Sequence, residues 1–417
     1  MDRIRITGGV ALRGAVRIAG AKNAALPAVA AAILTDEPLH LTNVPEVRDV
    51  TTMLRVIERL GAEWDTPNHG RRQIELRHVT NHEAPYELVR TMRASVLVLG
   101  PLLARNGRAR VSMPGGCAIG ARPINLHIDG LRRLGAEVSI DHGYVDARCP
   151  RLTGAEFEFE IVSVTGTENL MMAACLARGT TVLRNAAAEP EVADLALLLA
   201  RMGAKIEGAG THTITIEGVD RMSGAEHRIV PDRIEAGTYA VAAALTGGEV
   251  RLEGCRPEHL GAVLVHLERA GAEITPGPRG AVVSRKGALR PCDIETAPYP
   301  GFPTDMQAQW MALMTRAEGQ ARITEHIFEA RFLHALELQR MGAELSIDGN
   351  TVTTRGPSRL SGAEVTASDL RASACLVLAG LVAEGTTVVH RVYHLDRGYE
   401  RMEEKLRPLG ADIERIS

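Results

Sequence analysis

The stretch "TENLMMAACLARGTTVLRN", residues 167–185, decides the fold of this chain. Its first part, "TENLMMAACLARG" (167–179), is apolar or small nearly all round a helix, which predicts a helix buried on every side. Gly179 is placed to end that helix. The following "TTVLRN" is typical of a short strand. The stretch therefore predicts a buried helix followed directly by a strand.

The residues that follow predict a second helix of a different kind. "EPEVADLALLLARM" (189–202) has Pro190 in its first turn and Gly203 just past its end, as helix boundaries prefer. One face carries Val192, Leu195, Leu199 and Met202, which indicates an amphipathic helix lying on a surface. "AKIEG" and "HTITIEG" then pair through a Gly-containing turn as a hairpin. One structural unit is therefore predicted as helix, strand, helix, strand, strand.

This unit recurs along the whole chain. The phrases "RLGAEW", "RLGAEV", "RMGAKI", "RAGAEI", "RMGAEL" and "PLGADI" each follow a helical pattern, with their glycines at 61, 135, 203, 271, 342 and 410. A period this regular indicates internal repeats. The chain is therefore predicted to be an α/β protein of six repeats.

The sixth repeat ends after "GADIERI" and lacks its final strand. The N-terminal "RIRITGGVALRGA" (3–15) matches "TITIEGVDRMSGA" (213–225) of the third repeat, so we expect it to supply that strand. This predicts two domains of three repeats each, one of residues 22–229 and one of residues 1–21 with 230–417. Two chain crossings would join them, so a cleft between them could open and close.

Composition excludes several classes of protein. The 417 residues carry a net charge of only −3 and no Lys/Arg run, so a nucleic-acid partner is not indicated. The N-terminus lacks a signal-peptide core and the apolar runs are too short to span a membrane, so we expect a cytoplasmic protein. The six cysteines are scattered without metal-ligand spacing, so we expect neither disulfides nor a metal site.

Polar residues gather where the buried helices begin. They are Lys22 and Asn23 in the first repeat, Arg93 in the second, Thr304 and Asp305 in the fifth, and Asp369 and Arg371 in the sixth. Helix N-termini offer unpaired N–H groups and a partial positive charge, which favours anions. Taken singly, each of these residues could also be a helix cap or a member of a surface ion pair.

A second set lies between the strand and the amphipathic helix: Cys117, Arg122, Arg331 and Arg397. Converging Arg and Lys side chains suit a ligand with several negative charges, such as a phosphorylated acid or a nucleotide diphosphate. Cys117 lies in "PGGCAIG", where the surrounding glycines leave the thiol accessible, so we interpret it as functional and the other five cysteines as structural.

The chain resembles the enolpyruvyl transferases, and within them the branch that uses a UDP-sugar. The resemblance runs through "GAKNAALP", "MRASVLVLGPLLAR", "PGGCAIGARP", "FPTDMQAQ", "ITEHIFEARF", "DLRASACLVLAG" and "YHLDRGYERMEEKLRPLGA". It implies an inside-out α/β barrel for each domain. It also implies transfer of enolpyruvyl from phosphoenolpyruvate to the 3-hydroxyl of UDP-N-acetylglucosamine with release of phosphate, the first committed step of peptidoglycan synthesis, with no cofactor.

The resemblance also implies a role for each candidate residue. Cys117 is similar to the thiol that attacks or protonates phosphoenolpyruvate and that epoxide phosphonates capture. Lys22, Arg122 and Arg397 are similar to the phosphoenolpyruvate clamp. Asp305 is similar to the base for the sugar hydroxyl, and Arg331 and Arg371 line the same cleft. Contacts to the UDP-sugar are implied for Asn23, Arg93, Pro123, Ile124, Asn125, Leu126, Val162, Ser163, Val164, Thr165 and Ile327.

Two departures from the family pattern concern the uridine contacts. Asn125 stands where Asp is usual, and Ile161 and Thr165 differ from the common Lys-Val-Ser-Val-Gly form. Two alternative functions stay open. One is the shikimate-pathway enolpyruvyl transferase, although its Asn-Ala-Gly-Thr phrase is missing here. The other is a non-catalytic UDP-sugar-binding paralogue, although Cys117, Asp305 and Arg397 are all present. A thiol hydrolase is disfavoured because no His-containing phrase pairs with Cys117.

Overall fold

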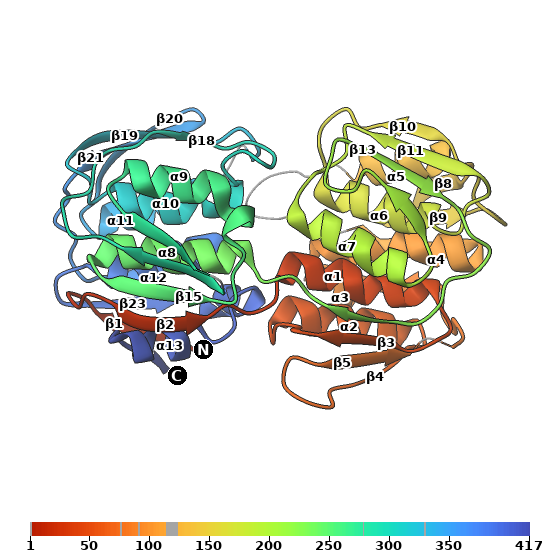
Figure 1. Cartoon of the computed structure of the whole chain (residues 1–417), viewed down its shortest axis with the longest axis horizontal. Coiled ribbons are helices and arrows are strands. Elements are labelled where there is room, and N and C mark those ends of the chain that lie inside the picture. The colour runs from red at the N-terminus through yellow and green to blue at the C-terminus, as the bar shows by residue number, and fades with distance from the viewer. Residues whose placement is uncertain (1, 76, 91, 114–123, 278, 329–330) are drawn as a thin grey trace. The chain divides into compact units, whose positions relative to one another are not determined.

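A computed structural model describes residues 2–75, 77–90, 92–113, 124–277, 279–328 and 331–417. Its internal contacts divide the chain into two compact units (Figure 1). Of the described residues, 2–19 and 231–417 belong to unit 1, and 20–113 and 124–230 belong to unit 2. Within the described ranges, the chain therefore crosses between the units after Ala19 and after Val230.

Three buried helices form the centre of unit 2. They are α1 (Lys22–Ala31), which continues as the short 3-10 helix η1 (Ala32–Leu34), the 3-10 helix η2 (Arg93–Val98) with α4 (Leu99–Asn106), and α6 (Val164–Ala174). These helices contact one another. The amphipathic helices are α2 (Arg48–Arg59), α5 (Asn125–Arg133) and α7 (Pro190–Arg201), and a short α3 spans Tyr86–Val89.

Unit 2 also contains three four-stranded sheets. The first has the order β14 (Ala225–Arg228), β3 (Leu39–Thr42), β5 (Arg72–Glu75), β4 (Glu63–Asp65). The second has β6 (Glu83–Ala84), β7 (Arg108–Ser112), β9 (Tyr144–Arg148), β8 (Glu137–Asp141). The third has β10 (Glu156–Glu158), β11 (Thr180–Arg184), β13 (Thr213–Glu217), β12 (Lys205–Glu207).

Unit 1 repeats this plan with its own three buried helices. They are α8 (Arg233–Thr246), the 3-10 helix η4 (Thr304–Met306) with α10 (Gln307–Met314), and α12 (Leu370–Gly380). Each of the three contacts the other two. The second helices of the repeats are η3 (Pro257–Leu260) with α9 (Gly261–Arg269), then α11 (Leu333–Arg340), and finally η5 (Val392–Arg397), α13 (Met402–Leu406) and η6 (Arg407–Leu409).

The sheets of unit 1 have the same four-stranded form. The first has the order β16 (Glu273–Gly277), β17 (Gly280–Ser284), β15 (Glu249–Glu253), β2 (Arg13–Arg17). The second has β18 (Ile294–Glu295), β19 (Gly319–Thr324), β21 (Thr351–Gly356), β20 (Glu344–Asp348). The third has β22 (Glu364–Thr366), β23 (Thr386–His390), β1 (Arg3–Thr7), β24 (Asp412–Ile416).

The third repeat confirms most of the predicted unit. Helix α7 and the antiparallel hairpin of β12 and β13 lie where the pattern placed them, and Val192, Leu195, Leu199 and Met202 are buried. The first helix is displaced from its prediction. It begins at Val164, because the Ser163 side chain accepts a hydrogen bond from the Gly166 N–H and caps it, and it ends at Ala174 rather than at Gly179.

Each repeat also has a strand that the predicted unit missed. A short strand after the hairpin leaves its own repeat and pairs in parallel with the first strand of another. In unit 2 these pairs are β6 with β7, β10 with β11, and β14 with β3; in unit 1 they are β18 with β19, β22 with β23, and β2 with β15. The three repeats of each unit are therefore linked in a closed ring.

The N-terminal strand completes the last repeat, as its sequence match predicted. Strand β1 lies between β23 and β24 and pairs antiparallel with both. Its Ile4 and Ile6 are fully buried, whereas Arg5 between them is exposed. In the described part of the chain, no helix has both the length and the apolar character needed to cross a membrane.

Candidate active site

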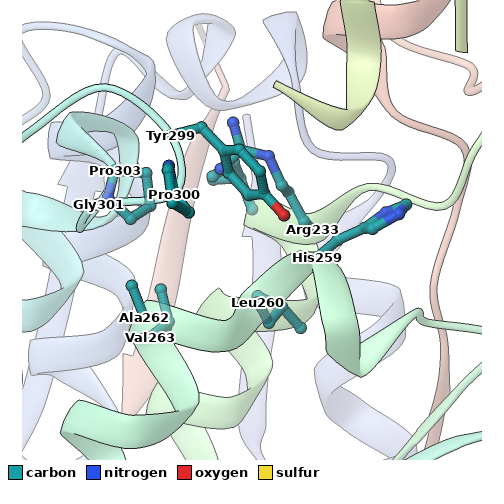
Figure 2. A pocket seen from close by; sticks show the side chains of 10 residues that line it. Arg233, His259, Leu260, Ala262, Val263, Tyr299, Pro300, Gly301 and Pro303 are labelled. Atoms are coloured by element: carbon teal, nitrogen blue, oxygen red, sulfur yellow. The ribbon is translucent and has the colours of Figure 1, made fainter. Parts of the chain in front are cut away.

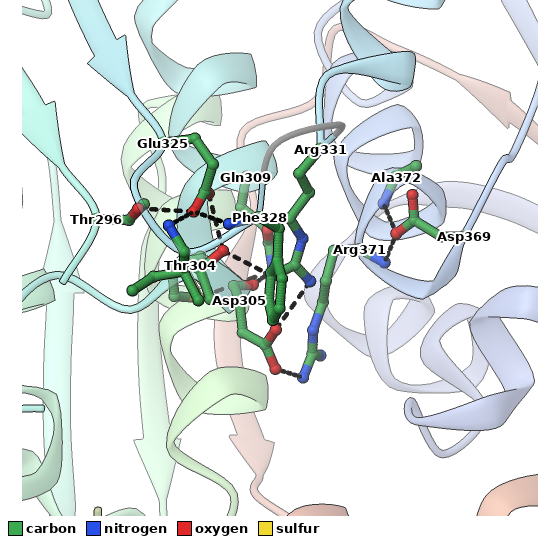
Figure 3. Close-up of polar contacts among 12 residues, drawn as sticks. Thr296, Thr304, Asp305, Gln309, Glu325, Phe328, Arg331, Asp369, Arg371 and Ala372 are labelled. Atoms are coloured by element: carbon green, nitrogen blue, oxygen red, sulfur yellow. Dashed lines mark hydrogen bonds and ion pairs between the residues drawn. The ribbon is translucent and has the colours of Figure 1, made fainter. Parts of the chain in front are cut away.

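The Asp305 carboxylate lies between two buried guanidinium groups of unit 1. Arg331 Nη2 donates to Asp305 Oδ1 at 2.8 Å, and Arg371 Nη2 donates to Asp305 Oδ2 at 2.6 Å (Figure 3). Both arginines are only 4% exposed, whereas the Asp305 side chain is 26% exposed. The site therefore presents a carboxylate whose charged form is stabilised by two fixed cations and which solvent can still reach.

Arg371 owes its place to the start of α12. The Asp369 side chain caps this helix by accepting hydrogen bonds from the N–H groups of Arg371 and Ala372, at 2.8 and 3.1 Å. Burial alone would lower the pKa of Arg371, but the charge and hydrogen bond of Asp305 outweigh it and raise that pKa above its ordinary value. Arg371 therefore stays charged although it is buried.

Two further predicted residues of unit 1 lie at the surface of this region. Ile327 follows β19 and is 37% exposed. Arg397 is the last residue of η5 and is partly buried. Burial, and after it the positive charge of Arg397, lowers the pKa of His394. The structure thus brings Asp305, Arg331 and Arg371 into direct contact. Near Arg397 it places His394, whose imidazole is neutral.

In unit 2, Lys22 and Asn23 occupy the first turn of buried helix α1, as predicted. The ammonium group of Lys22 pairs with Asp49 Oδ2 at 3.3 Å, and the two side chains are 14% and 5% exposed. Asp49 lies in the first turn of α2. Lys22, at the start of a buried helix, is thus positioned by a carboxylate from the neighbouring amphipathic helix of the same repeat.

His127 connects the predicted nucleotide-binding segments of unit 2. Asn169 of α6 contacts His127 Nδ1 at 2.9 Å, and Thr165 Oγ1 lies 3.4 Å from Nε2. Burial, and after it the charge of Arg93, lowers the pKa of His127 to about 4. Asn169 in turn accepts from the Gly100 N–H at 2.7 Å, an approach that a side chain at position 100 would block. A neutral imidazole therefore links α5 to α6, close enough to Arg93 for the charge of that residue to lower its pKa.

The two predicted uridine-binding segments form the starts of α5 and α6. In the first, Ile124 precedes the helix and Leu126 is buried, whereas Asn125 is exposed. The second, Val162, Ser163, Val164 and Thr165, is partly buried throughout. Thr165 lies beside the His127 ring in space, and Leu126 precedes His127 in the sequence. Both segments therefore meet at the same end of unit 2.

Cys117, Arg122 and Pro123 lie outside the described residues. The other five cysteines are free thiols. Burial raises the pKa of Cys175 to about 12 and also raises the pKa values of Cys255, Cys292 and Cys375. These raised values make the thiolate scarce at neutral pH, in keeping with a structural role.

A cavity elsewhere in unit 1 is too small to compete as the site. It is lined by Arg233, His259, Tyr299 and neighbouring residues, with the Arg233 guanidinium 5.7 Å from the centre of the Tyr299 ring (Figure 2). Its volume is about 10 Å³, which is room for about one water molecule. Among the described residues that line it, none belongs to the predicted site.

Sequence reasoning missed several residues that position the site. They are Asp49, His127, Asn169 and Glu325, the last of which bonds to Thr304 beside Asp305. Glu325 lies within a motif quoted for the resemblance, two residues before Ile327, and His127 directly follows the predicted contact Leu126. A polar residue next to a predicted contact, at a position that becomes buried, was the available signal.

Comparison with known proteins identifies the class of this site. Residues 6–406 match the family described as EPSP synthase (3-phosphoshikimate 1-carboxyvinyltransferase), and the chain belongs to this family of enolpyruvyl transferases. Within the family, it is 58% identical over its full length to the UDP-N-acetylglucosamine 1-carboxyvinyltransferase of Koribacter versatilis (strain Ellin345), 97% of which is covered. It is 57% identical to the enzyme of the same name from Halorhodospira halophila (strain DSM 244 / SL1), with both chains fully covered.

Solved structures agree on the fold. The enolpyruvyl transferase NikO from Streptomyces tendae superposes with a TM-score of 0.89 at 28% identity, covering 100% of this chain and 99% of that one. EPSP synthase from Acinetobacter baumannii superposes with a TM-score of 0.77 over the full length of both chains. At 20% identity, this second likeness shows the fold alone.

Proposed function

We propose that this protein is a UDP-N-acetylglucosamine 1-carboxyvinyltransferase, which transfers enolpyruvyl from phosphoenolpyruvate to the 3-hydroxyl of UDP-N-acetylglucosamine and releases phosphate. This is the first committed step of peptidoglycan synthesis, and we place it in the cytoplasm. The full-length identity of 58% to a relative of that name carries the proposal. The Asp305 carboxylate between Arg331 and Arg371 supports it, because the reaction needs a charged base next to anion-binding groups.

The proposed reaction is an addition followed by an elimination. Asp305 takes the proton of the sugar hydroxyl as its oxygen bonds to C2 of phosphoenolpyruvate, while a proton is delivered to the methylene carbon. The tetrahedral adduct keeps the phosphate at C2. When the former methylene carbon gives up a proton, the double bond re-forms and phosphate leaves C2. Fixed cations stabilise the anionic adduct. We assign this role to Lys22, Arg122 and Arg397.

The thiol of Cys117 is assigned to phosphoenolpyruvate. It acts either as the nucleophile that forms a covalent adduct or as the proton donor to the methylene carbon. We assign the UDP-sugar to Asn23, Arg93, Asp305, Ile327, Arg331 and Arg371, and to the segments that begin α5 and α6, namely Pro123, Ile124, Asn125 and Leu126 and then Val162, Ser163, Val164 and Thr165. The neutral His127 between these segments supports this assignment, since it fixes their polar groups without adding charge.

We also propose that each unit is an inside-out α/β barrel of three repeats and that each is a folding domain. Two observations support this view. Three helices contact one another at the centre of each unit, and many of their residues are fully buried. The linking strands join the three repeats of each unit in a ring.

The acceptor test separates the proposed function from its nearest alternative. We expect phosphate release from phosphoenolpyruvate to depend on UDP-N-acetylglucosamine and to be absent with shikimate 3-phosphate. A coupled phosphate assay with each acceptor measures this directly. Release with shikimate 3-phosphate alone would reassign the chain to the shikimate branch, and tight UDP-sugar binding without release would make it a non-catalytic paralogue.

Cys117 is expected to be the fastest cysteine to alkylate. The raised pKa values of Cys175, Cys255, Cys292 and Cys375 leave those thiols protonated, so limiting iodoacetamide followed by peptide mapping should label Cys117 first. An epoxide-bearing phosphonate should be captured at Cys117, and faster with UDP-N-acetylglucosamine bound.

Cys117→Ser should abolish this capture while leaving UDP-sugar affinity nearly intact, and Cys292→Ser serves as the control that should keep it. Preferential labelling of Cys175 or Cys375, or full turnover in the Cys117→Ser variant, would return Cys117 to the structural thiols.

A further inference from the structure

The Glu325 carboxylate is a buried hub that no step of the proposed reaction uses. The residue is 2% exposed and directly follows β19. Its Oε1 accepts from Thr296 Oγ1 at 2.8 Å and from the N–H groups of Ile327 and Phe328 at 2.7 and 3.1 Å. Its Oε2 accepts from Thr304 Oγ1 at 2.8 Å (Figure 3). Four donors therefore converge on one carboxylate.

The direction of the hydrogen bond from Thr304 is fixed by its second partner. Arg331 Nη1 lies 2.8 Å from Thr304 Oγ1, and a guanidinium group can only donate. The Thr304 oxygen therefore accepts from Arg331, and its own hydrogen goes to Glu325. Because the same guanidinium donates through Nη2 to Asp305, Arg331 donates toward both carboxylates, to Asp305 directly and to Glu325 through Thr304.

Glu325 also shapes the loop that carries Ile327. Its backbone is anchored at the turn between β20 and β21, where its N–H donates to the Asn350 carbonyl at 2.8 Å and its carbonyl accepts from Asn350 Nδ2 at 3.2 Å. From this anchored position its side chain curls over the loop and accepts from the N–H groups of the residues two and three positions further on. The Phe328 ring then lies 5.3 Å from the Arg331 guanidinium. The loop conformation and the Arg331 position thus depend on one carboxylate.

The charges of this cluster explain why the hub is a carboxylate. Arg331 and Arg371 contribute two positive charges, Asp305 and Glu325 contribute two negative charges, and the Asp369 carboxylate also interacts with the charge of Arg331. A glutamine at 325 would keep the shape but offer one accepting oxygen, with an NH2 donor in place of the other oxygen. One of the donors that converge on this side chain would then face an NH2 group, and the positive charges of Arg331 and Arg371 would be less fully balanced.

We propose that Glu325 is a positioning residue for the sugar-nucleotide acceptor, holding the Ile327–Phe328 backbone and the Thr304–Asp305 turn in one fixed arrangement. Glu325 thereby holds Asp305 next to the loop at Ile327, and it takes no part in the chemical steps. This inference rests on the proposed function, since Asp305 and Ile327 are assigned there to the acceptor. It predicts a defect in acceptor binding rather than in phosphoenolpyruvate binding.

The test compares three variants of the full chain. Glu325→Gln removes the charge, Thr304→Val removes the hydroxyl that links Glu325 to Arg331, and Thr354→Val is the matched control. Thr354 is a fully buried hydroxyl in β21 that donates to the carbonyls of Met314 and Ala321, so its loss tests stability alone. The measurements are the KM for each substrate, the calorimetric Kd for UDP-N-acetylglucosamine without phosphoenolpyruvate, and the thermal midpoint.

Glu325→Gln should raise the KM and Kd for UDP-N-acetylglucosamine by about 10- to 100-fold, the range for losing hydrogen bonds to a charged group. The KM for phosphoenolpyruvate, measured at saturating acceptor, should change by less than about threefold. Thr304→Val should shift the same constants in the same direction by a smaller factor, and it decides the question if Glu325→Gln does not fold. The Thr354→Val control should lower the thermal midpoint and leave both KM values unchanged.

Backbone amide exchange provides a readout that does not depend on the proposed function. The N–H groups of Ile327 and Phe328 should exchange faster in Glu325→Gln than in the wild type and at the wild-type rate in Thr354→Val. Equal losses of affinity for both substrates, or an unchanged Kd for the UDP-sugar in a folded Glu325→Gln variant, would overturn the inference. A wild-type protein that does not bind UDP-N-acetylglucosamine would instead overturn the proposed function, whatever the exchange rates show.

Discussion

The fragment of residues 230–417 is expected to remain unfolded unless residues 1–21 are supplied, whereas the fragment of residues 22–229 is expected to fold by itself. Circular dichroism and urea titration of the two separately expressed fragments measure this. A cooperative unfolding transition should be seen for 22–229 alone, and for 230–417 only after a peptide of residues 1–21 is added.

The size of this effect follows from the place of β1 in its sheet. The strand lies between β23 and β24, so its removal breaks two antiparallel ladders and exposes both neighbours. It also withdraws the fully buried Ile4 and Ile6 from the core of unit 1. Truncating one such isoleucine costs about 2–5 kcal/mol, and a whole domain is stable by only about 5–15 kcal/mol. Losing the entire strand therefore removes most or all of the stability of unit 1.

Two point variants of the full chain separate packing from charge in the same strand. Ile6→Ala should destabilise unit 1 by about 2–5 kcal/mol. Arg5→Ala, which removes an exposed side chain paired with Glu414, should change stability by less than about 1 kcal/mol. Cooperative folding of 230–417 without the peptide, or equal effects of the two variants, would show that β1 is not an integral part of the unit.

Much of this fold could be predicted because the same sequence pattern recurs in each repeat. The glycine after each amphipathic helix and the all-apolar helix before it recur at a steady period, so the third repeat could be read and applied to the others. Four of the six linking strands were missed for a physical reason. Strands β6 and β18 have two residues each and β10 and β22 have three, which is too short to show an alternating pattern. They form because a neighbouring repeat offers an open strand edge.

The candidate site divides along the same line. Asp305 and Arg371 could be predicted together because both begin buried helices, and such helices packed side by side bring their N-termini to one end. Glu325, Asn169 and Asp49 could not, because each acts through a partner that only the folded chain brings near. Asn169, for example, reaches the Gly100 N–H across the contact between α6 and α4. Local sequence showed where charge gathers but not which groups hold it in place.

Asp305→Asn is expected to lower kcat by about 10²- to 10⁴-fold, the range for losing a general base. The asparagine keeps the size of the side chain and an oxygen that can accept from Arg331 or Arg371, but it cannot take the proton of the sugar hydroxyl. The Kd for UDP-N-acetylglucosamine should therefore rise by less than about tenfold while turnover collapses. Stopped-flow phosphate release and calorimetric binding, made at a temperature where the variant is folded, measure the two quantities separately.

The alternative is that Asp305 matters only because it neutralises two buried arginines. Glu403→Gln is the matched control for this, because Glu403 is a carboxylate of unit 1 that is 4% exposed and accepts from Arg415 Nε at 2.6 Å, outside the proposed site. Each variant removes one charge from beside an arginine of unit 1, so each should lower the thermal midpoint. Only Asp305→Asn should lose turnover, because only Asp305 combines the arginine pair with access to solvent and hence to a substrate hydroxyl. A kcat for Asp305→Asn within about tenfold of the wild type would assign the proton transfer to another group and leave Asp305 as a counter-ion for Arg331 and Arg371.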